Sequence, residues 1–471
     1  MLKKPLISDY TTQAIGLYFV VLIIISALYI NHVLPLQWMV SGAVQTLFFF
    51  LLLPRLMSAW QTLPEKSFKR TVFGTALFIR IAYVFISYAM YTYYTGEPFE
   101  FDAGDAHFYT SVGEEFGNLP TLSNLDYARE VFRIAWSDMG HVLYIALIYL
   151  ITGSNIIVPR LVSALLSAYM CVLVYKLAQR NFGELPARYA AVIAVLLHNF
   201  IYYCGLSLKE MEMTFLVVLF LERADYALRA ENLQPKDMIL PVFAGGLLFL
   251  FRTALGASLW MSFFGALLFA EGRVMKWKNR VVVGVFMGIS AIFLFSGSIS
   301  EEVNVLWENR QSNQINQMNY RANRINGNKL ATYGTGAIFA PAILTIPLPT
   351  FVNVETQQNQ MYQNGGYLEK QVLGFFVYVA LFLLIFRYRS FRRHLLLLLF
   401  LFSYLCIIAF SSFAVSERFH LPSLPVFVIL AGFGITQIDK KMKAWYLPYL
   451  FLVALMVIGW NVFKLTGHEM I

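Results

Sequence analysis

Long apolar runs separated by short polar connections dominate the chain. Many of them approach the length of about 20 residues that an α-helix needs to cross the hydrocarbon core of a bilayer. The pattern therefore predicts an all-α polytopic membrane protein with about thirteen transmembrane helices. The expected spans are residues 13–30, 36–53, 74–94, 157–177, 186–204, 212–229, 237–252, 254–271, 280–297, 370–387, 394–412, 421–437 and 445–462.

Composition supports this interpretation. Of the 471 residues, 58% are hydrophobic and only 13% are charged, and the charged fraction is about half of that in soluble domains. The formal net charge is +9, but the basic residues lie in short clusters between apolar runs, which argues against nucleic-acid binding. These clusters are Lys66, Lys69 and Arg70; Arg273, Lys276, Lys278 and Arg280; Arg387, Arg389, Arg392 and Arg393; and Lys440, Lys441 and Lys443.

The basic clusters also predict the orientation of the chain, because cytoplasmic loops are enriched in Lys and Arg. Lys3 and Lys4 place the N-terminus in the cytoplasm. With the expected spans, every cluster then lies inside, and the long segments 95–156 and 298–369 lie outside. The apolar run 141–152 would break this agreement if it crossed the membrane, so we expect an interfacial or re-entrant helix on the outer surface.

The same pattern divides the chain into four parts. Residues 1–70 hold two N-terminal spans, and residues 71–297 hold the expected core together with its outer segment. Residues 298–369 form a polar outer loop rich in Asn and Gln, and residues 370–471 hold the C-terminal spans. A loop of this length between spans is usually functional or disordered.

An acidic stretch, FEFDAGDAHFY, follows the third span at the outer surface. Asp102 and Asp105 are three residues apart and would share one face of a helix. Such carboxylates can act as a general base toward a hydroxyl group, or they can ligate Mg²⁺ or Mn²⁺. The alternative is structural, with Asp102 capping the helix that contains GDAHFY.

A second pair of ionisable residues, Lys209 and Glu210, lies in a very short outer connection between two spans. Ionisable groups at the rim of a helix bundle are costly and tend to be functional. The alternative is a Lys–Glu pair that reaches to the membrane interface. Glu212 is a weaker candidate, because it lies nearer the next span.

Several arginines are also expected at outer helix ends. Arg252 lies between two apolar runs with no acidic residue nearby in sequence, and Arg418 and His420 lie in the last outer loop. A guanidinium group can bind two phosphate oxygens at once, so an anion site is one interpretation. The other is an arginine that contacts lipid headgroups. Arg160, at the outer start of a helix, is a weaker candidate.

The remaining polar candidates of the first outer segment are His107, Tyr109 and His141. Without a further cluster of His or Cys nearby, packing or a hydrogen bond is more expected for the histidines than zinc binding. The three cysteines are Cys171, Cys204 and Cys406; each falls within an apolar run, and they show no disulfide or metal-binding spacing.

In this order, the motifs GDAHFY, GHVLYIALIYLITGSNIIVPRLVSALL, LSLKE, RTALG and ERFHLPSLP resemble the GT-C superfamily of integral-membrane glycosyltransferases. The pattern is similar to that of the protein mannosyltransferases and the bacterial aminoarabinose transferases. It extends from about residue 71 to residue 270 and is patchier toward the C-terminus.

The resemblance implies specific roles. Asp105 matches the acid of the first outer loop and would be the catalytic base or a metal ligand, and Glu210 matches the acid of the second loop. The donor would be a sugar on a polyprenyl phosphate, and the acceptor a hydroxyl group of a glycan, lipid or protein. One departure concerns the metal: the family often has two adjacent acids or Asp-x-Asp, whereas Ala106 follows Asp105 here.

Two other functions are compatible with the sequence. A polysaccharide polymerase or ligase of the O-antigen type would use a polyprenyl diphosphate donor and arginines, for which Arg310, Arg321 and Arg324 are candidates. A transporter of lipid-linked glycans would place charges deep in the spans. Only Arg80 is a candidate for such a position, and we expect it to reach to the cytoplasmic surface. The expected location is a bacterial inner membrane with the site on the periplasmic face, although an ER lumenal face gives the same topology.

Overall fold

The computed structural model describes residues 7–118, 136–230, 235–269, 284, 342–409 and 415–465. Apart from one isolated β-bridge between Val33 and Val352, these residues form helices, turns and connecting segments. Among them, eight helices are long and apolar enough to cross a membrane, or nine if one bent pair is a single span. Four of these spans are α1 (Ser8–Leu28), α2 (Leu36–Trp60), α3 (Glu65–Thr95) and α7 (Ile157–Phe182). The other four are longer stretches that include adjoining helical turns: Asn364–Arg387 with α18 (Asn364–Phe382), Phe391–Ala409 with α19 (Leu395–Ala409), Glu417–Gln437 with α21 (Leu424–Gln437) and Lys440–Leu465 with α23 (Tyr446–Leu465). The bent pair is α8 (Glu184–Leu196) with the stretch His198–Gly205, which begins with α9 (His198–Tyr202).

The prediction of an all-α membrane protein is confirmed, whereas the number of thirteen spans is not. Three further helices coincide with expected spans but are shorter or more charged: α10 (Glu210–Arg229), α11 (Pro235–Phe251) and α12 (Thr253–Phe269). The expected span 280–297 lies almost wholly outside the described residues. The run 141–152 is part of α6 (Trp136–Thr152), which is apolar but short. The expected end of the polar loop at residue 369 is wrong, since α18 already begins at Asn364.

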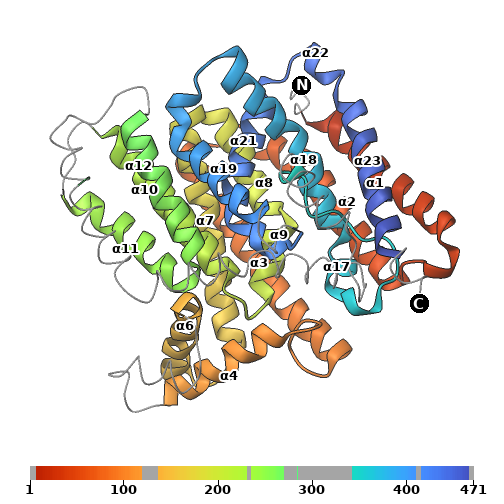
Figure 1. Ribbon diagram of the computed structural model, residues 1–471, viewed down its shortest axis with the longest axis horizontal. Helices are drawn as coiled ribbons and strands as arrows, with labels where there is room; N and C mark the ends of the chain where they lie inside the picture. Colours follow the sequence, from red (N-terminus) through yellow and green to blue (C-terminus); the bar gives the residue numbers. More distant parts are fainter. Residues whose placement is uncertain are drawn as a thin grey trace.

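The acidic stretch lies at the opposite end of the helix bundle from the basic clusters of residues 66–70 and 440–443 (Figure 1). Helix α3 begins beside the cluster around Lys66 and ends just before the stretch that contains Asp105. In Figure 1, α4 (Gly104–Asn118) and α6 lie below the bundle, whereas α22 (Lys440–Lys443) lies at its top. The end that carries α4 and α6 also receives the start of α10 and the end of α11.

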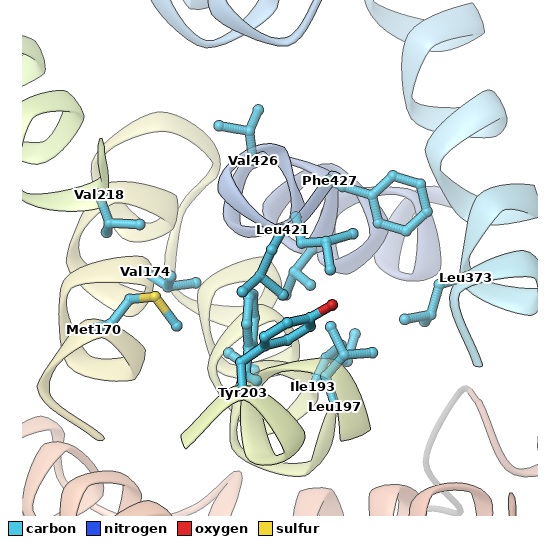
Figure 2. Packing of buried hydrophobic residues seen from close by; sticks show 14 of the residues in the cluster. Met170, Val174, Ile193, Leu197, Tyr203, Val218, Leu373, Leu421, Val426 and Phe427 are labelled. Carbon is cyan, nitrogen blue, oxygen red and sulfur yellow. The ribbon is translucent and has the colours of Figure 1, made fainter. Parts of the chain in front are cut away.

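Helix α21 occupies the centre of the bundle, between α8 and α18 (Figure 1). Two glycines allow this close approach. A Cβ atom on Gly432 would lie 2.6 Å from the Pro186 carbonyl oxygen, and one on Gly434 would lie 2.0 Å from that of Phe376. Small residues at such positions are typical of helix packing in membranes. Apolar side chains of α7, α8, α10 and α18 fill the space around α21 (Figure 2).

The break between α8 and α9 is stabilised by two buried charged side chains. The two helix axes differ by 50°. Arg80 of α3 donates hydrogen bonds to the carbonyl oxygens of Ala194 (3.0 Å) and Val195 (3.3 Å). On the other side, a carboxylate oxygen of Glu369 accepts a hydrogen bond from the His198 backbone N–H at 2.9 Å. The Arg80 cation complements the helix dipole at the C-terminus of α8. The Glu369 carboxyl oxygen satisfies a backbone donor that the break leaves without an intrahelical partner.

The expectation that Arg80 reaches to the cytoplasmic surface is therefore wrong, because its exposed fraction is 0%. Its side chain provides donors for carbonyl groups that the helix break leaves without intrahelical partners. Its burial is accounted for by this local need, so it does not favour a transporter.

Replacing Arg80 with leucine should destabilise the fold strongly, because each buried carbonyl oxygen left without a donor costs roughly 1–3 kcal/mol. Thermal unfolding of the detergent-purified protein measures this as a lower Tm. Arg387→Ala is the matched control, since it removes an exposed ion pair with Asp439 and should change the Tm little. An Arg80→Leu variant as stable as the control would contradict this role.

Candidate active site

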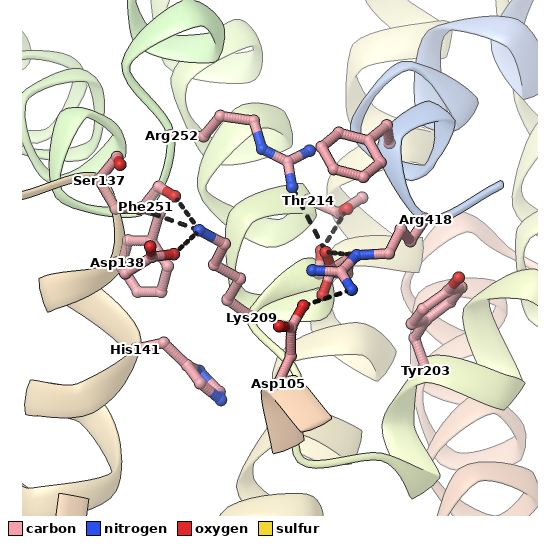
Figure 3. Close-up of polar contacts among 12 residues, drawn as sticks. Asp105, Ser137, Asp138, His141, Tyr203, Lys209, Thr214, Phe251, Arg252 and Arg418 are labelled. Atoms are coloured by element: carbon pink, nitrogen blue, oxygen red, sulfur yellow. Dashed lines mark hydrogen bonds and ion pairs between the residues drawn. The ribbon is translucent and has the colours of Figure 1, made fainter. Parts of the chain in front are cut away.

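Four segments that are distant in sequence bring charged side chains together at one end of the bundle (Figure 3). Asp105 lies in the first turn of α4, and Glu210 is the first residue of α10. Arg252 is the single residue between α11 and α12. Arg418 lies in the short helix α20 (Glu417–His420), which leads into α21.

The carboxylate of Glu210 is the centre of this arrangement. Its Oε1 atom lies 3.0 Å from Arg418 Nε and 3.4 Å from Arg252 Nη2. A second guanidinium nitrogen of Arg418, Nη1, lies 2.6 Å from Asp105 Oδ2. Glu210 is fully buried, whereas the Asp105 side chain is 54% exposed. The four residues therefore form a chain of ion pairs that extends from the protein interior to an accessible carboxylate.

Both arginines also pack against one aromatic ring. The guanidinium carbon of Arg252 lies 4.1 Å from the centroid of the Phe419 ring, and that of Arg418 lies 5.4 Å from it. A cation over an aromatic face is stabilised by the ring quadrupole. The ring helps to keep two like charges on the same side of Glu210.

A second network fixes the connection before α10. Lys209 donates hydrogen bonds to the carbonyl oxygens of Ser137 (3.0 Å) and Phe251 (2.8 Å) and forms an ion pair with Asp138. Tyr109 donates to the same carboxylate at 2.8 Å. Burial would raise the pKa of Asp138, but Lys209 and these hydrogen bonds lower it below its usual value. The network joins α4, α6, α10 and α11 beside Glu210 and Arg252.

Two residues of the acidic stretch lie apart from the ion-pair chain. Asp102 is exposed, has a left-handed backbone with φ of 57°, and precedes α4. The expectation that it shares a helix face with Asp105 is therefore wrong. His107 is half-exposed, lies 3.3 Å from Glu97 and stacks on Phe99 with a centroid distance of 4.1 Å.

The other two histidines are buried on either side of the cluster. His141 packs against Tyr109 and Tyr144, and its Nδ1 atom lies 3.8 Å from a carboxylate oxygen of Glu212. Burial lowers the pKa of His141 to about 4. His420 is also fully buried, with its Nδ1 atom 3.2 Å from Lys370 Nζ. Neither histidine takes part in the chain of ion pairs.

Three acids near the site were missed from the sequence: Glu100 and Glu417 are buried, and Asp138 is partly buried. Asp138 comes directly before the apolar run of α6, and Glu100 is part of the quoted acidic stretch. Glu417 precedes Arg418; it accepts a hydrogen bond from Tyr203 at 2.6 Å and another from Asn199. These contacts hold α20 against the α9 region and so fix the position of Arg418. All three acids lie beside the sequence motifs described above, and this proximity could have indicated them. Their burial cannot be predicted from the sequence.

Within the part of the chain that the structure describes, Asp102 and Asp105 do not form a common site for Mg²⁺ or Mn²⁺. The described residues contain no group of three or more His, Cys, Asp or Glu side chains that could hold a metal ion. Asp102 does not converge with Asp105, and the Asp105 carboxylate is bound by Arg418.

Sequence comparison identifies one family over part of this region. Residues 139–299 match the model of the dolichyl-phosphate-mannose-protein mannosyltransferase family. The match includes Glu210 and Arg252 and confirms the resemblance to the GT-C superfamily over this segment. It supports a membrane-embedded enzyme that transfers a sugar. No curated protein sequence matches the chain.

Solved structures of membrane glycosyltransferases are similar to the chain at low sequence identity. ArnT from Cupriavidus metallidurans, bound to undecaprenyl phosphate, is 14% identical with a TM-score of 0.49, covering 86% of this chain and 73% of ArnT. The oligosaccharyltransferase AglB from Archaeoglobus fulgidus, in complex with an inhibitory peptide and a dolichol-phosphate, is 13% identical with a TM-score of 0.44. That match covers 86% of this chain and 56% of AglB.

Replacing Glu100 with glutamine should increase stability above neutral pH. Burial raises the pKa of Glu100 from 4.5 to about 7. Between these values the folded state retains a proton that the unfolded state has lost, so the wild type loses stability as the pH rises. Between pH 5 and pH 8, the free energy of unfolding of the variant should rise relative to that of the wild type by up to roughly 3 kcal/mol. The exposed Glu115→Gln control should show the same pH dependence of stability as the wild type. The same pH dependence in Glu100→Gln would contradict the raised pKa of Glu100.

Proposed function

We propose that this protein transfers a sugar from a polyprenyl-phosphate donor to an acceptor hydroxyl group at the extracytoplasmic membrane face. The observation that carries the proposal is the convergence of Arg252 and Arg418 on the buried carboxylate of Glu210. The site lies at the bundle end opposite the basic clusters of residues 66–70 and 440–443. With those clusters in the cytoplasm, the positive-inside rule favours an outward-facing site.

The two arginines are suited to a lipid-linked phosphate. Each guanidinium carries five N–H donors. Within the described residues, the bonds to Glu210, Asp105 and Tyr404 use only some of these donors. The remaining donors can bind phosphate oxygens in the bidentate manner that guanidinium groups favour. Glu210 holds both cations in place before the donor arrives, which reduces the cost of ordering them.

The half-exposed Asp105 is the proposed general base. Its carboxylate accepts the proton of the acceptor hydroxyl, whose oxygen forms a bond to the anomeric carbon of the donor. The bond between that carbon and the phosphate oxygen breaks, and the phosphate leaves with the electron pair. Arg252 and Arg418 stabilise the charge that develops on the phosphate. Attack from the side opposite the leaving group inverts the anomeric centre.

The ion pair between Arg418 and Asp105 provides a link between donor binding and catalysis. In the structure, the Asp105 carboxylate lies 2.6 Å from Arg418 Nη1. A phosphate that binds Arg418 would compete for the same guanidinium group. Donor binding should therefore release the Asp105 carboxylate for contact with the acceptor hydroxyl.

Two arginines could also bind a diphosphate, as a polymerase or ligase of the O-antigen type would require. The further arginines expected for that function, Arg310, Arg321 and Arg324, lie outside the described residues. The binding experiment below separates the two donors.

Undecaprenyl phosphate should raise the Tm of the detergent-purified wild type. At a ligand concentration of about 100 times Kd, linkage gives a stabilisation of about 2.7 kcal/mol. Arg252→Ala should lose this gain, and Asp105→Asn should keep it, because only the arginine contacts the phosphate. Arg387→Ala serves as a control for loss of a surface arginine. Stabilisation by undecaprenyl diphosphate alone would instead favour the polymerase or ligase.

Asp105→Asn should abolish most of the sugar transfer while leaving donor binding intact. Loss of a general base typically reduces kcat by about 10²–10⁴-fold. Transfer from the polyprenyl-phosphate donor can be followed in membranes that contain the native acceptor. Asp102→Asn is the matched control and should retain activity, because Asp102 lies outside the ion-pair chain. Wild-type transfer by Asp105→Asn would show that another group is the base.

A further inference from the structure

A pair of buried, oppositely charged side chains lies next to the candidate active site. Glu100 lies between α3 and α4, and Arg160 lies in the first turn of α7. Their exposed fractions are only 7% and 1%. Arg160 contacts Pro98, which lies close to Glu100 in sequence, and Ser207, which lies close to Glu210. The pair therefore lies beside the ion-pair chain.

Each of the two side chains has a buried polar atom without a hydrogen-bond partner. Arg160 donates from Nε to Ser207 Oγ (3.2 Å) and from Nη2 to the Pro98 carbonyl oxygen (2.6 Å), whereas its Nη1 has no partner. Glu100 Oε2 is also unpartnered. Among the described residues, the two side chains form no ion pair with each other or with a third residue. Buried donors and acceptors are normally paired, so these two atoms mark a place for a polar group.

The second carboxylate oxygen of Glu210, Oε2, is the third such atom in this neighbourhood. The other carboxylate oxygen, Oε1, contacts Arg252 and Arg418. These two contacts fix the orientation of the carboxylate and therefore the position of Oε2. The neighbourhood therefore offers one charged donor, from Arg160, and two acceptors, from Glu100 and Glu210.

This combination selects the chemistry of the ligand. The ionised form of Glu100 would repel a phosphate, and Arg160 would repel an ammonium group. A hydroxyl group both donates and accepts a hydrogen bond, so one hydroxyl can accept from Arg160 while it donates to Glu100. A neutral, polyhydroxylated sugar satisfies both side chains without introducing a new charge.

We propose that Glu100 and Arg160 form the subsite that holds a hydroxyl group of the donor sugar, while Arg252 and Arg418 hold its phosphate. This inference rests on the proposed function and deepens it. Because Arg160 is bound to Ser207, just before Glu210 in sequence, the subsite adjoins the phosphate-binding residues. It would orient the sugar ring relative to Asp105.

The test compares lipids with and without a sugar. Dissociation constants are measured for undecaprenyl phosphate, undecaprenyl phosphate-glucose and undecaprenyl phosphate-mannose with the purified full-length protein. The wild type should bind at least one sugar conjugate more tightly than undecaprenyl phosphate. Glu100→Leu should weaken binding of that conjugate by about tenfold, the effect of losing a hydrogen bond to a charged group. Its affinity for undecaprenyl phosphate should not change.

Two further variants guard against a general loss of structure. Glu100→Gln keeps a hydrogen-bonding oxygen and should lose only roughly threefold. Arg160→Gln should show the same selective loss as Glu100→Leu. Glu97→Gln, an exposed acid of the same short segment, should bind all three lipids as the wild type does.

The possible outcomes distinguish this inference from the proposed function. If Glu100→Leu weakens all three lipids equally, or if the wild type gains nothing from either sugar, the subsite is wrong while the phosphate site stands. If the wild type does not bind undecaprenyl phosphate, the proposed function fails and the subsite with it.

Discussion

The ion pairs of Glu210 with Arg252 and Arg418 are the interaction on which the site depends. Two guanidinium groups repel each other, and burial makes that repulsion larger. A single carboxylate between them allows both cations to remain at this end of the helix bundle. The position of Glu210 as the first residue of α10 also suits the positive end of the helix dipole. Removing that carboxylate would leave two partly buried cations without their common partner.

The fold brings these residues together through its interrupted helices. Arg252 occupies the one-residue interruption between α11 and α12, and Arg418 lies in the short helix before α21. The break between α8 and α9 allows Tyr203 to reach Glu417 and so to hold α20 in place. Irregular backbone of this kind is tolerated in a membrane protein only where other groups satisfy it. Arg80 and Glu369 supply such groups at the α8–α9 break.

The sequence predicted the helical architecture well, because apolar runs of membrane-spanning length are a strong signal. The four residues of the ion-pair chain, Asp105, Glu210, Arg252 and Arg418, were all candidates from the sequence, since charges directly beside apolar runs are unusual and informative.

The sequence was less informative about how these residues pair. The pairing of Asp105 with Arg418 joins residues more than 300 positions apart, and no periodicity reveals such a contact. Arg80 was misjudged because the helix break that requires it lies on another helix. Asp102 was assigned to the helix of Asp105, although its left-handed backbone places it before that helix. Glu100 was overlooked because it lies in the same acidic stretch as the exposed Asp102. Its burial depends on Arg160 and the start of α7, which are distant in sequence.

The central claim is that Arg252 and Arg418 together bind the phosphate of a polyprenyl lipid. An experimental structure of the protein with undecaprenyl phosphate tests it most directly. The account predicts phosphate density within hydrogen-bonding distance of both guanidinium groups, with Glu210 still bound between them. Phosphate density at another position, with both arginines bound only to Glu210 and Asp105, would contradict it.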